Sequence, residues 1–160
     1  MKKVLTVFAI AMVFLLSSCS LLTDLLPGTV STGIVSTSSG YDLDNGKEYS
    51  DLNDSNVDLI LEPWWDSGSP APGLQLHSWG DSLTFIFDLG VISINDASKK
   101  SDEELVPDTI GWDVYVKTGH TYFIVIESTK QFYLYADNLD ITEYDNYYDA
   151  ELTFKYMEKK

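Results

Sequence analysis

Apolar and polar residues alternate with a period of two in short runs beyond residue 40, separated by turn-forming residues, and this pattern is typical of β-strands. The clearest predicted strand is Ser82 to Asp88, in which Leu83, Phe85 and Phe87 share one face that we expect to point into a core. No run of helical length has the 3.6-residue period of an amphipathic helix. The pattern therefore predicts an all-β protein.

Further strands follow from the same alternation, and turns separate them. They are expected at Val57 to Glu62, Trp112 to Lys117, Thr121 to Glu127, Phe132 to Ala136 and Leu152 to Tyr156. In the fourth of these, Tyr133 and Tyr135 should point outward. Turns at Thr118 to His120 and at Ser128 to Lys130 would join the later strands into a meander. Seven or eight strands in about 120 residues predict an antiparallel β-sandwich, two sheets packed on one core.

Two stretches interrupt the alternation and are predicted to be loops: Trp64 to Gly73 (WWDSGSPAPG) and Asn95 to Asp108. The second has a helix-capping pattern, Ser101 followed three residues later by Glu104, which predicts one helical turn around Asp102 to Leu105. Asn45-Gly46 is the strongest hairpin-turn dipeptide of the chain.

The first eighteen residues have the features of a secretory signal: two lysines, an apolar run from Val4 to Leu16, and small residues at its end. The sequence Leu16-Ser17-Ser18-Cys19 then resembles the lipobox of bacterial lipoproteins. This resemblance implies that Cys19 becomes the lipidated first residue of an exported protein held on a membrane, the outer membrane if the cell is Gram-negative. Several acyl chains would hold such a protein firmly.

The resulting domain organisation has three parts. Residues 1–18 are the signal peptide, residues 19–39 a lipid-anchored tether rich in Ser, Thr and Gly, and residues 40–160 the β-sandwich. Within the tether, Thr29 to Thr37 could also form an edge strand.

Charge narrows the choice of partners. The chain has 160 residues with ten lysines, no arginine and 25 acidic residues, and its formal charge is -15. After loss of the signal peptide, eight lysines remain against 25 acidic residues, a formal charge of -17. Nucleic acid is therefore excluded as a partner, since it requires a concentrated basic surface. The single cysteine excludes an internal disulfide and a cysteine-rich zinc site.

Acidic residues cluster in turns, at Asp42 to Asn45, Asp51 to Asp58 and Asp137 to Asp149, and such oxygen-rich turns raise the possibility of a calcium site. The first cluster departs from the calcium-binding EF-hand loop, because its Gly stands one position early and Asn53 occupies the place of the bidentate Glu. Asp and Asn are also ordinary turn residues. We therefore predict no metal site here.

The two histidines, His77 and His120, raise the possibility of haem or zinc ligation, but neither has a supporting motif. Catalytic patterns are also missing: the chain has no G-x-S-x-G nucleophile elbow and no Gly-rich oxyanion loop. We therefore expect no enzyme activity and no cofactor.

Aromatic residues give the remaining functional indication. Trp64 and Trp65 stand side by side in a loop rich in Pro and Gly, next to Asp66, and Tyr147 and Tyr148 lie among acids. Such rings could stack on a sugar or anchor a protein partner, whereas one Trp could instead fill the end of the core. The sequence predicts a lipid-anchored, non-catalytic binding or structural module of the cell envelope, with a glycan or an envelope protein as its partner. The alternatives are a carbohydrate-binding module that uses Trp64 and Trp65 and, third, a calcium- or haem-binding lipoprotein.

Overall fold

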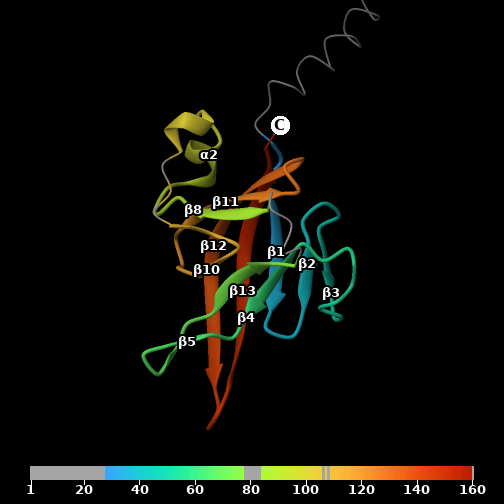
Figure 1. Ribbon diagram of the computed structural model, residues 1–160, viewed down its shortest axis with the longest axis vertical. Coiled ribbons are helices and arrows are strands. Elements are labelled where there is room, and N and C mark those ends of the chain that lie inside the picture. Colours follow the sequence, from blue (N-terminus) through green and yellow to red (C-terminus); the bar gives the residue numbers. More distant parts are fainter. Residues whose placement is uncertain (1–27, 78–83, 106, 108, 160) are drawn as a thin grey trace, which may run out of the picture.

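A computed structural model describes residues 28–77, 84–105, 107 and 109–159, which form two main antiparallel sheets (Figure 1). The six-stranded sheet contains, in spatial order, β1 (Ser31–Ser36), β13 (Tyr148–Glu158), β12 (Lys130–Glu143), β11 (Thr121–Ile126), β8 (Phe85–Asp88) and β9 (Thr109–Gly111). The five-stranded sheet contains β10 (Asp113–Tyr115), β7 (Gly73–Leu76), β4 (Leu59–Glu62), β2 (Gly40–Asp42) and β3 (Lys47–Tyr49). A small hairpin joins β5 (Trp65–Asp66) to β6 (Ser69–Pro70). The predicted all-β sandwich is confirmed, although the described chain divides into thirteen strands rather than seven or eight.

The main core lies between the two sheets, where apolar side chains from both are buried. Its members include Val35, Leu59, Leu61, Leu74, Leu76, Ile124, Phe132, Leu134, Leu152 and Phe154. Six of these residues lie at alternate positions of three strands predicted from the sequence: Leu59, Leu61, Phe132, Leu134, Leu152 and Phe154. This burial is the main source of stability, at about 25 cal/mol per Å² of apolar surface removed from water.

The face assignment of the strand predicted at Ser82 to Asp88 is wrong. Residues 82 and 83 lie outside the described part, and β8 begins at Phe85. Ile86 belongs to the main core, and Thr84 and Asp88 on the same face are also buried, whereas Phe85 and Phe87 lie half-buried on the opposite face. Polar Thr84 and Asp88 can be buried because each accepts hydrogen bonds there, Thr84 from the backbone N–H of Glu127 and Asp88 from several donors described below.

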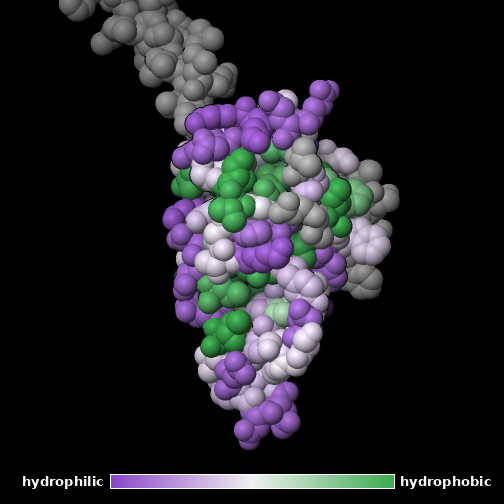
Figure 2. All heavy atoms as spheres, turned by 90° about the vertical axis from the view of Figure 1, so that its left-hand side faces the viewer, coloured by the Kyte–Doolittle hydropathy of each residue, from purple (hydrophilic) through white to green (hydrophobic). Residues whose placement is uncertain are grey.

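A second, smaller core covers the outer face of the six-stranded sheet. It contains Ile94 and Ala97 from the short helix α2 (Ile94–Ala97), together with Phe123, Tyr133 and Met157 from the sheet, and Phe87 packs against it. Figure 2 shows apolar residues gathered in the upper part of this side of the molecule. Tyr133 does point away from the main core, as predicted, but this second core buries it.

The loop predicted at Asn95 to Asp108 contains α2 and the helical turn η1 (Asp102–Glu104). Ser93 caps α2 by accepting a hydrogen bond from the backbone N–H of Asp96 at 3.1 Å. The turn η1 lies where the Ser101–Glu104 pattern predicted it, and Glu104 Oε2 accepts hydrogen bonds from both the N–H and the hydroxyl of Ser101. The hairpin predicted at Asn45-Gly46 is also present between β2 and β3, with Gly46 at a φ of +64°.

The turn at Thr118 to His120 has a different role from the one predicted. It connects β10 of the five-stranded sheet to β11 of the six-stranded sheet, so only β11, β12 and β13 form the meander. Trp112, the first residue of the strand predicted at Trp112 to Lys117, lies just before β10 and is 53 % exposed, whereas Val114 is buried. The change of sheet brings β10 next to β8 and creates the setting of the site described below.

The two ends of the described chain meet in one sheet. β1 is an edge strand that pairs with β13 from Ser31↔Tyr156 to Ser36↔Glu151. It lies within Thr29 to Thr37, the part of the predicted tether for which an edge strand was the alternative. The hairpin of β12 and β13 projects beyond both sheets at the opposite end (Figure 1). Within the described residues, no helix has the length and apolar character needed to span a membrane.

Candidate functional site

A pocket of about 400 Å³ opens where β10 of one sheet lies beside β8 of the other. Six residues line it: Trp64, Asp88, Asp113, Val114, Tyr115 and Lys117. They come from three separate parts of the chain: the end of β4, the end of β8, and β10 with the residues after it. The pocket thus combines two aromatic rings with two carboxylates and one ammonium group.

Trp64 is held in place from several sides. Its backbone carbonyl accepts hydrogen bonds from the N–H of Ala71 at 2.9 Å and from the hydroxyl of Tyr148, and its own N–H donates to the carbonyl of Glu62 at 3.0 Å. Its ring lies over Gly73, where a Cβ atom would come within 2.1 Å of a ring carbon. Only glycine leaves room for this position of the indole.

Tyr115 forms the second aromatic wall. Its ring meets that of Trp64 edge to face, with centroids 5.6 Å apart and an interplanar angle of 90°, and Tyr115 is 48 % exposed. The buried hydroxyl of Tyr122 fixes the backbone behind it, because it donates to the carbonyl of Tyr115 at 3.2 Å and accepts from the N–H of Lys117 at 2.8 Å. Burial raises the pKa of Tyr122, which keeps this hydroxyl protonated as a donor.

Asp88 is the polar centre of the pocket and is only 1 % exposed. His120 Nδ1 lies 2.8 Å from its Oδ1, the backbone N–H of Gly90 donates to the same oxygen at 2.9 Å, and Lys117 Nζ lies 3.2 Å from its Oδ2. Burial acts to raise the pKa of Asp88, but the hydrogen bonds from His120, Gly90 and Lys117 outweigh it, so the pKa lies below its ordinary value. Asp88 is therefore an ionised, rigidly held acceptor.

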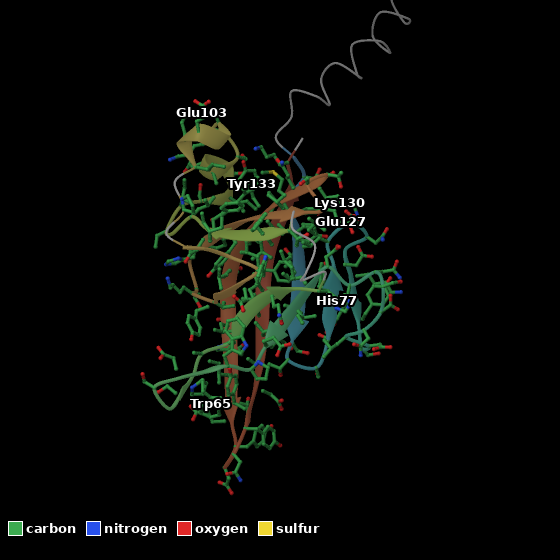
Figure 3. All side chains as sticks on the ribbon, in the orientation of Figure 1. Trp65, His77, Glu103, Glu127, Lys130 and Tyr133 are labelled. Carbon is green, nitrogen blue, oxygen red and sulfur yellow. The ribbon has the colours of Figure 1, made fainter. Side chains whose placement is uncertain are left out.

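The structure separates the aromatic residues that the sequence grouped as ligand-binding. Trp65 is 44 % exposed and its ring meets Tyr148 edge to face at 5.1 Å, near the projecting hairpin (Figure 3). Tyr148 is 2 % exposed and belongs to the main core, so its ring is not available to a ligand. Tyr147 is exposed and stacks on Tyr144 at 4.4 Å, and Asp66 is exposed beside Trp65. Of the residues predicted, Trp64 alone lines the pocket.

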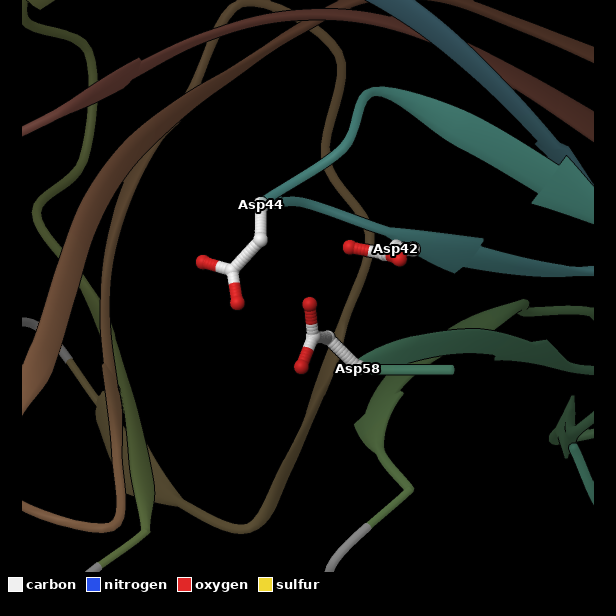
Figure 4. Close-up of side chains that lie close together, drawn as sticks. All are labelled: Asp42, Asp44 and Asp58. Atoms are coloured by element: carbon white, nitrogen blue, oxygen red, sulfur yellow. The ribbon is translucent and has the colours of Figure 1, made fainter. Parts of the chain in front are cut away.

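Three carboxylates converge at the β2–β3 turn: Asp42, Asp44 and Asp58 have oxygens within 4.8 Å of one another (Figure 4). Asp42 accepts from the N–H and the amide of Asn45, at 2.9 and 2.7 Å, and Asp58 accepts from the N–H of Leu43 at 2.8 Å. Lys130 forms an ion pair with Asp44. The carboxylates thus hold the turn together, and the chain itself supplies one positive charge.

Crowding changes the acidity of this cluster. Burial, together with the charges of Asp44 and Asp42, raises the pKa of Asp58 to about 6, although the hydrogen bond from Leu43 and the charge of Lys130 act to lower it. Carboxylate oxygens are the ligands that calcium prefers. One oxygen from each carboxylate gives three ligands, fewer than the six to eight that calcium takes. The remaining ligands would have to be the second carboxylate oxygens, backbone carbonyls or water.

The histidines lie apart from any metal-binding constellation in the described chain, since neither belongs to a group of three convergent ligands. His77 ends β7, where its N–H donates to the carbonyl of Asp58, and His120 contacts Asp88. Among the described residues, no serine hydroxyl has a hydrogen bond to His120.

Comparison with known proteins identifies no similar protein. No family model matches the chain, and neither the curated proteins nor the solved structures include a match. Cys19 and the lipobox-like sequence before it lie outside the described residues.

Most of the pocket was missed in the sequence. Asp88 was predicted only as the end of a strand whose core face was assigned to Leu83, Phe85 and Phe87. Tyr115 and Lys117 fell in another predicted strand and His120 in a turn, with no link between them. Their convergence depends on β10 crossing to the other sheet, and no local pattern signals that crossing.

Proposed function

We propose that the protein is a lipid-anchored, non-catalytic glycan-binding module of the cell envelope, and that the pocket of Trp64, Tyr115, Asp88 and Lys117 holds one sugar unit. The observation that carries the proposal is the perpendicular pair of rings beside two fixed charged groups. A sugar has an apolar face of C–H groups that packs on aromatic rings, and hydroxyl groups that bond to carboxylates and ammonium groups.

Binding rather than turnover is supported by the state of Asp88. Its two oxygens are already engaged by His120, Gly90 and Lys117, which suits an acceptor held in one orientation better than a group that exchanges protons. The pocket volume of about 400 Å³ lies within the usual range for small-molecule sites.

The anchor rests on the sequence. Cys19 in a lipobox-like context, after a signal-like segment, supports lipidation and export, which would place the pocket at a membrane surface outside the cytoplasm. There the ligand would be an envelope or environmental polysaccharide.

Tyr115→Ala is the sharpest test, because this side chain is half exposed and its loss should leave the fold intact. The full chain is screened on a glycan array, and the best ligand is then titrated by calorimetry against the wild type and the variant. We expect at least about a tenfold loss of affinity, the equivalent of about 1.4 kcal/mol. Tyr147→Ala is the matched control, since Tyr147 is an exposed tyrosine outside the pocket.

The outcomes distinguish between the pocket and the projecting hairpin as the glycan-binding site. Loss with Tyr115→Ala alone supports the pocket, whereas loss with Tyr147→Ala or Trp65→Ala alone moves the glycan site to the projecting hairpin. An array without any ligand contradicts the proposed function.

A further inference from the structure

The second half of β12, residues 138–143, pairs with a neighbouring strand along one edge only. β11 accompanies β12 as far as Tyr135, and the last backbone bonds on that side join Ala136 to Gly119 and His120. After a bulge at Asp137, the six residues Asn138 to Glu143 pair with β13, and no described strand pairs with their other edge. This edge belongs to the hairpin that projects from the body of the protein (Figure 1).

An open strand edge exposes backbone N–H and C=O groups that can pair with an additional strand. Natural proteins normally keep such edges short or cover them. The exposed segment from Asn138 to Glu143 is as long as an average strand, so one more strand could join the sheet along its whole length.

The register assigns a different chemistry to each face of this edge. Leu139 and Ile141 lie opposite Leu152 and Ala150, whose side chains are buried, so they share the inner, apolar face. Asn138, Asp140 and Thr142 lie on the outer face, opposite Thr153, Glu151 and Asp149.

Among the described residues, no cation pairs with the acidic side chains of the outer face, Asp140, Asp149 and Glu151, although the amide of Asn138 donates to Asp140 Oδ2 at 2.8 Å. Asp140 stands directly opposite Glu151, and like charges in this relation are destabilising. Asp149 lies one pair further along, whereas Lys155 on the same face forms its ion pair with Asp137, 3.0 Å away on the body side of the hairpin. A cation placed beside Asp140 would relieve this repulsion.

We propose that the Asn138–Glu143 edge of β12 binds an extended segment of a partner protein in which apolar residues alternate with lysine or arginine. The apolar residues of the added strand would extend the face of Leu139 and Ile141, and its basic residues would lie beside Asp140. A second copy of this chain is the wrong occupant, because its own edge would bring more carboxylates to the same face.

The test uses the full chain and a defined probe, a fluorescein-labelled peptide of about eight alternating lysine and valine residues, followed by fluorescence anisotropy. Two comparison peptides separate the contributions. One replaces lysine by glutamate, and the other keeps every lysine but replaces two central valines by proline, which cannot complete a strand ladder.

Asp140→Lys is the informative variant, and Glu48→Lys is its matched control. Glu48 is an exposed acid on β3, which is also an edge strand, and the two substitutions change the net charge equally. We expect at least about tenfold weaker binding of the lysine peptide to Asp140→Lys, less than about a twofold change for Glu48→Lys, and improved binding of the glutamate peptide to Asp140→Lys.

Amide hydrogen exchange of the complex locates the peptide: protection should increase between residues 138 and 143. Equal affinity for the proline peptide, equal loss in both variants, or no saturation at millimolar peptide would overturn the proposal, because each outcome indicates diffuse attraction or none. Tyr115→Ala should leave this binding unchanged, so the result is independent of the glycan pocket.

Discussion

The indole of Trp64 and the backbone of Gly73 are in such close contact that a methyl group at residue 73 would overlap the ring. This contact joins the end of β4 to the start of β7, two strands that pair in the five-stranded sheet. It sets the depth at which the ring enters the pocket. A substitution at Gly73 should therefore alter the shape of the pocket without replacing any residue that lines it.

Gly73→Ala should therefore lower the free energy of unfolding by about 1–3 kcal/mol, the usual effect of overpacking, and should weaken glycan binding by displacing the ring. Urea unfolding measures the first effect. In a Trp64→Phe background the smaller ring leaves room for the methyl group, so the cost of Gly73→Ala should shrink. Equal costs in the two backgrounds would show that the ring does not press on residue 73.

Trp64→Ala and Trp65→Ala should differ in their effect on stability. Trp64 is largely enclosed by Gly73 and Tyr115, so Trp64→Ala should lower the free energy of unfolding by about 2 kcal/mol or more. Trp65 is exposed and would lose only its edge-to-face contact with Tyr148, so Trp65→Ala should lower it by less than about 1 kcal/mol. Thermal and urea unfolding of both variants check this order. A larger loss of stability in Trp65→Ala would show that Trp65, and not Trp64, is the more enclosed ring.

Asp88 should stabilise the fold only where it is ionised. Its pKa in the folded state lies below the unfolded value of about 3.9, so its contribution is complete above about pH 4 and declines as the pH falls through the folded pKa. Asp88→Asn should cost about 1–3 kcal/mol at pH 7 and much less near pH 2. Urea unfolding across this range measures the difference, with Asp113→Asn, an exposed acid of the same pocket, as the control.

Asp58 should have the opposite effect. Its folded pKa of about 6 exceeds the unfolded value of about 3.9, so the ionised group disfavours folding above pH 6, and the penalty disappears as the pH falls from about 6 to 4. Asp58→Asn should raise the stability at pH 7 by on the order of 1 kcal/mol and flatten the pH dependence in this window, since the amide oxygen can still accept from Leu43. Asp66→Asn, an exposed acid remote from the cluster, should change neither. A loss of stability at pH 7 in Asp58→Asn would show that the carboxylate is required, as a bound cation would require it.

Cys19→Ser should prevent lipid attachment, because only a thiol at this position can carry the thioether that the lipobox resemblance implies. Labelled fatty acid should enter the wild-type chain in a bacterial host and not the variant, and the variant should leave the membrane fraction as a result. Incorporation of label into Cys19→Ser would contradict the anchor.

Alternation along the sequence was sufficient to predict strands at β4, β8 and β10 to β13, and to indicate many residues of the main core, since a period of two is a local property of each strand. It could not decide which face of β8 points inward. Both faces of that strand are covered, one by the opposite sheet and one by the segment that contains α2. Phe87 therefore had a second apolar environment available, and Phe85 contacts the ring of Phe87. Asp88 could take the inner face because His120 and Lys117 supply partners from distant positions and the N–H of Gly90 supplies a local one.

The candidate site was harder to predict than the fold, because its residues are far apart in the sequence. Trp64 and Tyr115 are fifty-one positions apart and meet only because β10 crosses to the sheet of β4 and β7. Trp64 and Trp65, adjacent in the chain, alternate in direction and therefore contact different tyrosines, Tyr115 and Tyr148. Adjacency in the sequence thus grouped residues that the strand geometry separates.

The pairing of β1 with β13 has a consequence for biogenesis. Ser31 meets Tyr156, so β1 cannot pair until β13 has been made. The repeated passage between sheets also gives most contacts a large separation along the chain. Such topologies fold slowly, because distant segments must find each other before their contacts can compensate for the loss of chain entropy. During synthesis β1 therefore lacks its partner until β13 has emerged. If the chain is exported, as we propose, this delay would leave time for a translocation machinery to thread it, still unfolded, across a membrane.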